Sequence, residues 1–154
     1  MKKLLFALAA ALLLIFSACR NDDDSPSNPP LSPLVGTWKL TKAVAFSGTG
    51  NTVLQEIPTP ACEGQSTFQF RQDNKFTFKT YSSATGTCTL DSTDDGTYAY
   101  NTNTKIMTFN YNDGTSETTQ VKSLSNTEMQ ILIDTEDVND DGTLDQIVAI
   151  MNKQ

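Results

Sequence analysis

The sequence has 154 residues, about the length of a single domain, and carries 11 lysines and arginines against 18 aspartates and glutamates, a net charge of −7. It contains no histidine, which excludes Ser-His-Asp and Cys-His catalysis, histidine metal ligands and an imidazole general base. The acidic balance argues against nucleic acid as a partner, because phosphates would repel it. We therefore expect neither an enzyme nor a nucleic-acid-binding protein.

The N-terminal residues are typical of an export signal. Lys2 and Lys3 precede an uninterrupted apolar run over residues 4–16, which ends in Ser17-Ala18-Cys19. The run is shorter than the ~20 residues that a transmembrane helix needs. The Ser-Ala-Cys ending resembles a bacterial lipobox. This resemblance implies a lipoprotein signal peptide over residues 1–18 and a lipid on Cys19 that anchors the protein in a membrane. A signal peptide cleaved elsewhere is the alternative.

Residues 19–33 are predicted to form a tether between the lipid and a folded domain. Residues 20–25 are rich in aspartate, and prolines at 26, 29, 30 and 33 keep such a segment extended. The acidic cluster after the cysteine resembles the export signal of surface lipoproteins of Bacteroidota type, which implies an outer-membrane protein at the cell surface. A solvated linker with a run of charges is the alternative interpretation.

Residues 34–154 favour an all-β domain. Residues 32–36 have the pattern of one helical turn, with serine first, proline next and glycine last. Short segments with alternating apolar residues follow, separated by turn residues. Strands are expected over 36–46, 51–57, 67–71, 75–79, 96–101, 106–111, 115–124, 128–135 and 144–151. A small antiparallel up-and-down β-barrel of about eight strands would hide the sheet edges, and a two-sheet β-sandwich fits the same pattern.

Alternation places a set of aromatic side chains on one face of these strands. Such a face is buried in a barrel, where it either fills the core or surrounds a ligand cavity. The candidate cavity residues are Trp38, Phe68, Phe70, Phe78, Tyr98, Tyr100 and Phe109. The expected ligand is a small apolar or amphipathic molecule. A filled core in an interaction or scaffold protein, which would recognise a protein or glycan through its loops, is the alternative.

The segment that begins the domain resembles a known barrel family. Gly36-Thr37-Trp38 after a short helical turn is similar to the opening of a lipocalin, where Gly-x-Trp starts the first strand and the tryptophan closes the barrel floor. The order of leader, cysteine, acidic tether, Gly-x-Trp and Phe-x-Phe hairpins resembles the lipocalin-like lipoproteins of Bacteroidota. Lipocalins also stack an arginine on this tryptophan, but Arg71, the one arginine in 34–154, lies mid-chain, so no such partner is expected.

Two further cysteines, Cys62 and Cys88, are predicted to form a disulfide. An even pair in an exported domain is by default bonded, and this bond would join segments on either side of the 67–79 hairpin. A redox-active pair is the alternative, although the sequence has no Cys-x-x-Cys motif.

A loop near the C-terminus has the pattern of a calcium site. Oxygen-bearing residues stand at positions 1, 3, 5, 7 and 9 of the segment 137–145, with glycine at position 6. The predicted ligands are Asp137, Asn139, Asp141, the Thr143 carbonyl and Asp145. Val148 stands where an EF-hand has glutamate, so the loop is instead similar to the calcium hairpins of integrin-type propellers. A solvated acidic turn is the alternative. Asp91, Asp94 and Asp95 form a second expected acidic loop, without metal-ligand spacing.

Overall fold

The computed structural model describes residues 32–84 and 86–154. Residues 31–154 form one compact unit. The predicted signal peptide (1–18), the lipid attachment at Cys19 and nearly all of the tether therefore lie outside the described residues. Within the described ranges, no helix is long and apolar enough to cross a bilayer.

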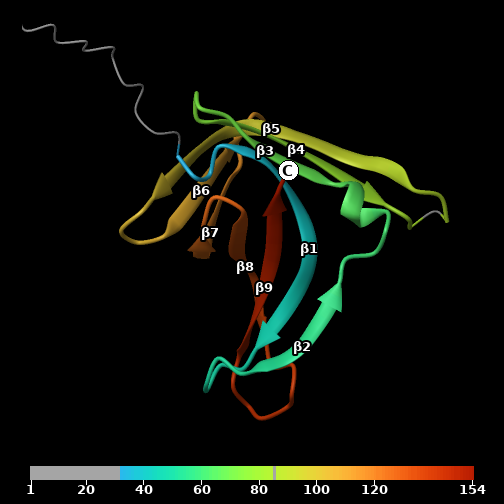
Figure 1. Ribbon diagram of the computed structural model, residues 1–154, viewed down its shortest axis with the longest axis vertical. Coiled ribbons are helices and arrows are strands. Elements are labelled where there is room, and N and C mark those ends of the chain that lie inside the picture. Colours follow the sequence, from blue (N-terminus) through green and yellow to red (C-terminus); the bar gives the residue numbers. More distant parts are fainter. Residues whose placement is uncertain (1–31, 85) are drawn as a thin grey trace, which may run out of the picture. The chain divides into compact units, whose positions relative to one another are not determined.

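The domain is built from antiparallel strands joined largely by tight turns (Figure 1). The 3-10 helix η1 (Glu63–Gln65) interrupts them between the second and third strands. The strands are β1 (Gly36–Phe46), β2 (Val53–Pro58), β3 (Thr67–Phe70), β4 (Lys75–Ser82), β5 (Thr89–Asn101), β6 (Ile106–Tyr111), β7 (Ser116–Leu124), β8 (Glu128–Glu136) and β9 (Asp145–Lys153).

The last strand pairs with the first, so the sheet closes into a barrel. β9 runs along nearly the whole of β1, from Trp38 opposite Lys153 to Phe46 opposite Gln146. On the other side of β1, its first residues pair with β3 and its last with β2. Eight strands thus close the barrel, and β2 is an additional strand that pairs with β1 alone. The predicted barrel is confirmed, and the sandwich alternative is excluded.

One strand differs clearly from the sequence prediction. β5 begins at Thr89, seven residues before the expected start, so the predicted acidic loop around Asp91, Asp94 and Asp95 is part of a strand. Cross-strand hydrogen bonds between polar side chains support this extension, with Thr77 donating to Asp95 over 2.6 Å and the Thr80 and Ser92 hydroxyls 2.8 Å apart. The extension was missed because its side chains are mostly polar and exposed, so hydrophobic alternation does not mark it.

The barrel interior around Trp38 is filled by one hydrophobic cluster. Trp38, Phe76, Met107, Val121 and Met129 are each fully buried, and together they come from five strands. Phe70, Tyr98 and Phe109 complete the aromatic part of this cluster. A second, smaller cluster of Val44, Val148 and Ile150 packs on the β1–β9 pair.

The first residues of the domain cover one end of the barrel. The backbone N–H of Val35 donates to the Ser32 carbonyl, which makes the single turn expected from the sequence. Leu34 is buried, and the Trp38 Nε1–H donates to its carbonyl over 2.8 Å. The turn and the tryptophan therefore close this end together.

Candidate functional site

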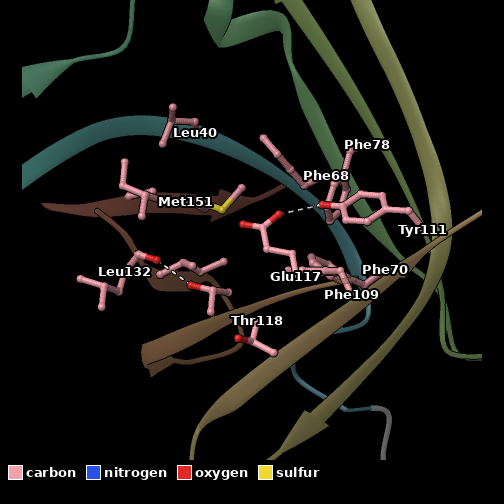
Figure 2. A pocket seen from close by; sticks show the side chains of 14 residues that line it. Leu40, Phe68, Phe70, Phe78, Phe109, Tyr111, Glu117, Thr118, Leu132 and Met151 are labelled. Carbon is pink, nitrogen blue, oxygen red and sulfur yellow. Dashed lines mark hydrogen bonds between the residues drawn. The ribbon is translucent and has the colours of Figure 1, made fainter. Parts of the chain in front are cut away.

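A cavity of about 380 Å³ opens inside the barrel, and Trp38 is not among the residues that line it (Figure 2). Its wall comes from seven of the eight barrel strands, and most of its side chains are apolar. This volume lies within the range of small-molecule sites in proteins. The lining residues are Leu40, Phe68, Phe70, Phe78, Phe109, Tyr111, Glu117, Thr118, Thr119, Ile131, Leu132, Ile133, Ala149 and Met151.

The aromatic part of the wall comes from β3, β4 and β6. Phe68, Phe70, Phe78 and Phe109 belong to the predicted set and do line the cavity. Their rings contact one another edge-on or tilted, with Phe78 centred 5.1 Å from Phe68 and 5.2 Å from Phe109. Such contacts hold aromatic side chains in fixed positions, so this wall is largely preformed.

Three residues of the predicted set do not line the cavity. Trp38 is fully buried at the closed end, Tyr98 packs edge-on against Phe70, and Tyr100 lies on the periphery of the core cluster. The Tyr98 hydroxyl donates to the Arg71 carbonyl over 2.8 Å, which directs it toward a turn. These residues point inward as alternation predicts, but they pack in or against the hydrophobic cluster and do not reach the cavity wall.

Sequence reasoning missed the aliphatic part of the wall. Leu40 on β1, residues 131–133 on β8, and Ala149 and Met151 on β9 line the cavity. In Figure 2, Leu40, Leu132 and Met151 lie across the cavity from the aromatic rings. Their strands were predicted, but aliphatic residues occur on so many strands that nothing singled these out. The pairing of β9 with β1 and β8 brings them together.

Two polar side chains meet at the cavity wall. The Tyr111 hydroxyl donates to Glu117 Oε2 over 3.1 Å (Figure 2). Burial raises the pKa of Tyr111 to about 12, and the hydrogen bond and charge of Glu117 add to this effect. The phenol is therefore protonated at neutral pH and is a stable donor. The Thr119 hydroxyl, also on the wall, donates to the Leu132 carbonyl over 2.6 Å.

The tryptophan at the closed end has a cationic partner that the sequence did not suggest. Lys153 Nζ lies 5.1 Å from the centre of the Trp38 ring and donates to the Pro33 carbonyl over 2.7 Å. Gly36 has a φ of +145°, and a Cβ at this position would overlap the Lys153 side chain. Glycine is favoured here because a residue with a Cβ is strained at this positive φ, and its absence also leaves room for the lysine side chain.

The predicted disulfide is present. Cys62 and Cys88 are bonded, with 5.4 Å between their Cα atoms. Cys62 is buried immediately before η1, and Cys88 immediately precedes β5. The bond therefore ties the segment that leads into β3 to the outer end of the β4–β5 hairpin. A structural disulfide of this kind is typical of an exported protein.

The predicted calcium loop, residues 137–145, is closed by hydrogen bonds from its own backbone. Both Asp137 carboxylate oxygens accept backbone N–H groups, from Asp141 and Gly142. Asp141 accepts the Thr143 N–H and the Asn139 side-chain amide. The Thr143 hydrogen bond is the largest cause that lowers the pKa of Asp141.

The last residue of this loop, Asp145, is fully buried. Its two oxygens accept the backbone N–H groups of Gly48 and Val138, each over 2.9 Å. Asp145 thus joins the β1–β2 loop to the β8–β9 loop. Across residues 32–84 and 86–154, no three histidine, cysteine or acidic side chains are arranged to hold a metal ion. Calcium binding stays a prediction.

Comparison with known proteins gives one family match. A family model described as a lipocalin-like domain matches residues 34–131. No curated protein matches the chain.

Among solved structures, similar folds include the bovine lipocalin allergen Bos d 2, 14% identical over 82% of this chain and 76% of that chain, with a TM-score of 0.43. Others are the odorant-binding protein OBP1, 12% identical over 82% and 75% with a TM-score of 0.41, and bovine odorant-binding protein in complex with undecanal, 13% identical over 83% and 76% with a TM-score of 0.41.

Proposed function

The chain belongs to the family of lipocalin-like domains, and we propose that it binds a small apolar or amphipathic molecule inside its barrel. The observation that supports this most directly is the cavity of about 380 Å³ with its mainly apolar wall. Apolar surface that a ligand covers is removed from water, which contributes roughly 25 cal/mol per Å². An unfilled space inside a closed barrel is also the feature that distinguishes a carrier from a scaffold protein with a filled core.

We propose binding without catalysis. The cavity wall offers one carboxylate, one phenol and two threonines, and the sequence has no histidine. The Glu117 carboxylate accepts a hydrogen bond from the Tyr111 hydroxyl, and the phenol remains protonated at neutral pH. This arrangement orients a ligand and does not activate a nucleophile.

Binding can be tested by titrating the fluorescent probe N-phenyl-1-naphthylamine into residues 31–154, which contain the whole closed sheet and both core clusters. Ala149 lies on the wall, so Ala149→Phe should fill the cavity and weaken probe binding about tenfold or more. Ala99→Phe is the matched control, because Ala99 is exposed on β5. Absence of probe binding to the folded wild type, or equal weakening in both variants, would contradict the proposal.

We further propose that a lipid on Cys19 anchors the protein in the outer membrane, at the cell surface. The support is the sequence alone: a basic start, an apolar run and Ser17-Ala18-Cys19, followed by an acidic, proline-containing segment. Metabolic labelling with an alkyne fatty acid should label the wild type and not Cys19→Ala. Label retained in Cys19→Ala would refute the anchor.

A further inference from the structure

The cavity wall carries one charge, and its position is unexpected. Among the lining residues in the described part of the chain, only Glu117 has a carboxylate, and none is a lysine or an arginine. Glu117 lies directly opposite Phe109 in the β6–β7 register. Residues opposite each other in an antiparallel pair point to the same face of the sheet, and Phe109 points into the barrel. The register therefore directs Glu117 inward, as Figure 2 also shows.

The other residues on the inward face of β7 also indicate that Glu117 points into the barrel. Thr119 and Val121 follow Glu117 at the alternate positions, Thr119 lies on the wall, and Val121 is fully buried in the core. Glu117 itself is exposed, so it lies where the cavity meets solvent. An inward position next to these residues is normally apolar in a barrel of this kind. A carboxylate there loses part of its hydration when the cavity fills, which costs free energy unless a partner compensates.

The protein itself supplies only part of that compensation. Tyr111 donates one hydrogen bond to Oε2, and no ion pair within residues 32–84 and 86–154 includes Glu117. The carboxylate thus stands where the cavity meets solvent, and no cationic side chain of the described residues pairs with it. The Tyr111 ring and the neighbouring Phe78 and Phe109 rings present further electron-rich surface, which also favours a cation.

Building on the function proposed above, we propose that the ligand is an amphiphile with an ammonium headgroup, which pairs with the Glu117 carboxylate while its apolar part occupies the cavity. The same carboxylate rejects fatty acids and other anionic amphiphiles, because two negative charges would be brought together beside an apolar wall. Tyr111 is a positioning residue, since its hydroxyl holds one carboxylate oxygen and leaves Oε1 for the ligand. The net charge of −7 acts in the same direction by attracting cations.

The test uses three ligands that share one apolar chain: decylamine, decanol and decanoate. Each displaces N-phenyl-1-naphthylamine from residues 31–154 at neutral pH and low salt, and decanol is the uncharged reference within each variant. We expect wild-type protein to bind decylamine about tenfold more tightly than decanoate. The preference should decrease with added salt, because the ligand headgroup is only partly shielded from solvent.

Glu117→Gln removes the charge and keeps the shape, so the ratio of decylamine to decanol affinity should fall well below that of the wild type. Glu128→Gln is the matched control, because it removes the same charge from an exposed position outside the cavity wall. Its ratio should equal that of the wild type.

The outcomes separate this inference from the function on which it rests. If the probe and decanol bind but decylamine has no advantage over decanoate, or if Glu117→Gln keeps the wild-type preference, the ammonium inference is wrong and the carrier function stands. If neither the probe nor any decyl compound binds, the carrier function itself fails, and the inference fails with it.

Discussion

Loss of the Cys62–Cys88 disulfide should destabilise the domain without unfolding it. The two cysteines are 26 residues apart in sequence, and for a loop of this size the chain-entropy relation gives about 3.5 kcal/mol of stabilisation. The bond acts mainly by restricting the unfolded chain, so its loss should leave the native structure intact. Neither cysteine belongs to the hydrophobic clusters, and the segments that they join lie outside the central core. A domain of ordinary stability, about 5–15 kcal/mol, tolerates such a loss.

The measurement is urea denaturation of the wild type and of the double variant Cys62→Ala/Cys88→Ala, followed by fluorescence. Trp38 is the one tryptophan of the sequence and is fully buried, so its emission reports on the closed end of the barrel. The variant should show native emission without urea and a midpoint lowered by the equivalent of about 3–4 kcal/mol. Because Cys62 is itself buried, wild-type protein with its disulfide reduced serves as the control for lost packing. If the free energy of unfolding falls by less than about 1 kcal/mol in both the double variant and the reduced wild type, the disulfide does not stabilise the domain by restricting the unfolded chain.

Three further predictions concern Tyr111, Lys153 and the loop 137–145. Tyr111 has a pKa of about 12, because burial and then neighbouring carboxylates favour the neutral phenol. Its contribution to the free energy of unfolding should therefore be fully present below the ordinary pKa near 10 and be lost as the pH rises from about 10 to 12. The ultraviolet titration of tyrosinate should lack its highest step in Tyr111→Phe, and an unchanged titration curve would contradict the assignment. Lys153→Met should lower the free energy of unfolding by about 1–2 kcal/mol, measured by urea denaturation, because it removes both the cation over the Trp38 ring and the hydrogen bond from Lys153 to the Pro33 carbonyl. An unchanged midpoint would show that neither contact contributes to stability. Excess Ca²⁺ should raise the melting temperature if loop 137–145 binds it; no shift, or the same shift in Asp141→Ala, would remove the calcium prediction.

The sequence predicted strands most reliably where a pattern of apolar side chains indicates which face is buried. The alternating phenylalanines of β3 and β4 identified both strands and their inward faces, since only a half-buried strand needs that pattern. The disulfide followed from the cysteine count. Polar segments carry no such signal, because backbone pairing alone can hold them in a sheet. For that reason the sequence predicts a loop over the first half of β5, although Thr80 and Ser92 pair across it.

The cavity was harder to predict than the barrel, because alternation gives the direction of a side chain and not whether other side chains or open space lie in front of it. Trp38 and Phe78 both point inward, yet the first is packed at the closed end and the second faces open space. Likewise, the cation on Trp38 comes from the penultimate residue, Lys153, and only closure of β9 on β1 brings them together. Properties that depend on closure between distant strands are not contained in local patterns.

Glu117 is different, because the sequence did contain the signal that identifies it. Asn112-Asp113-Gly114 marks a tight hairpin, and such a turn fixes the register of the strands on either side. Counting outward from this turn places Glu117 opposite Phe109, as the structure has it. An acidic residue opposite a buried aromatic one is a conflict that a purely structural sheet would avoid, and such local conflicts gather where function requires them. Applied to the corresponding hairpins of other family members, the same count should separate barrels with a charged interior position from those with a wholly apolar one.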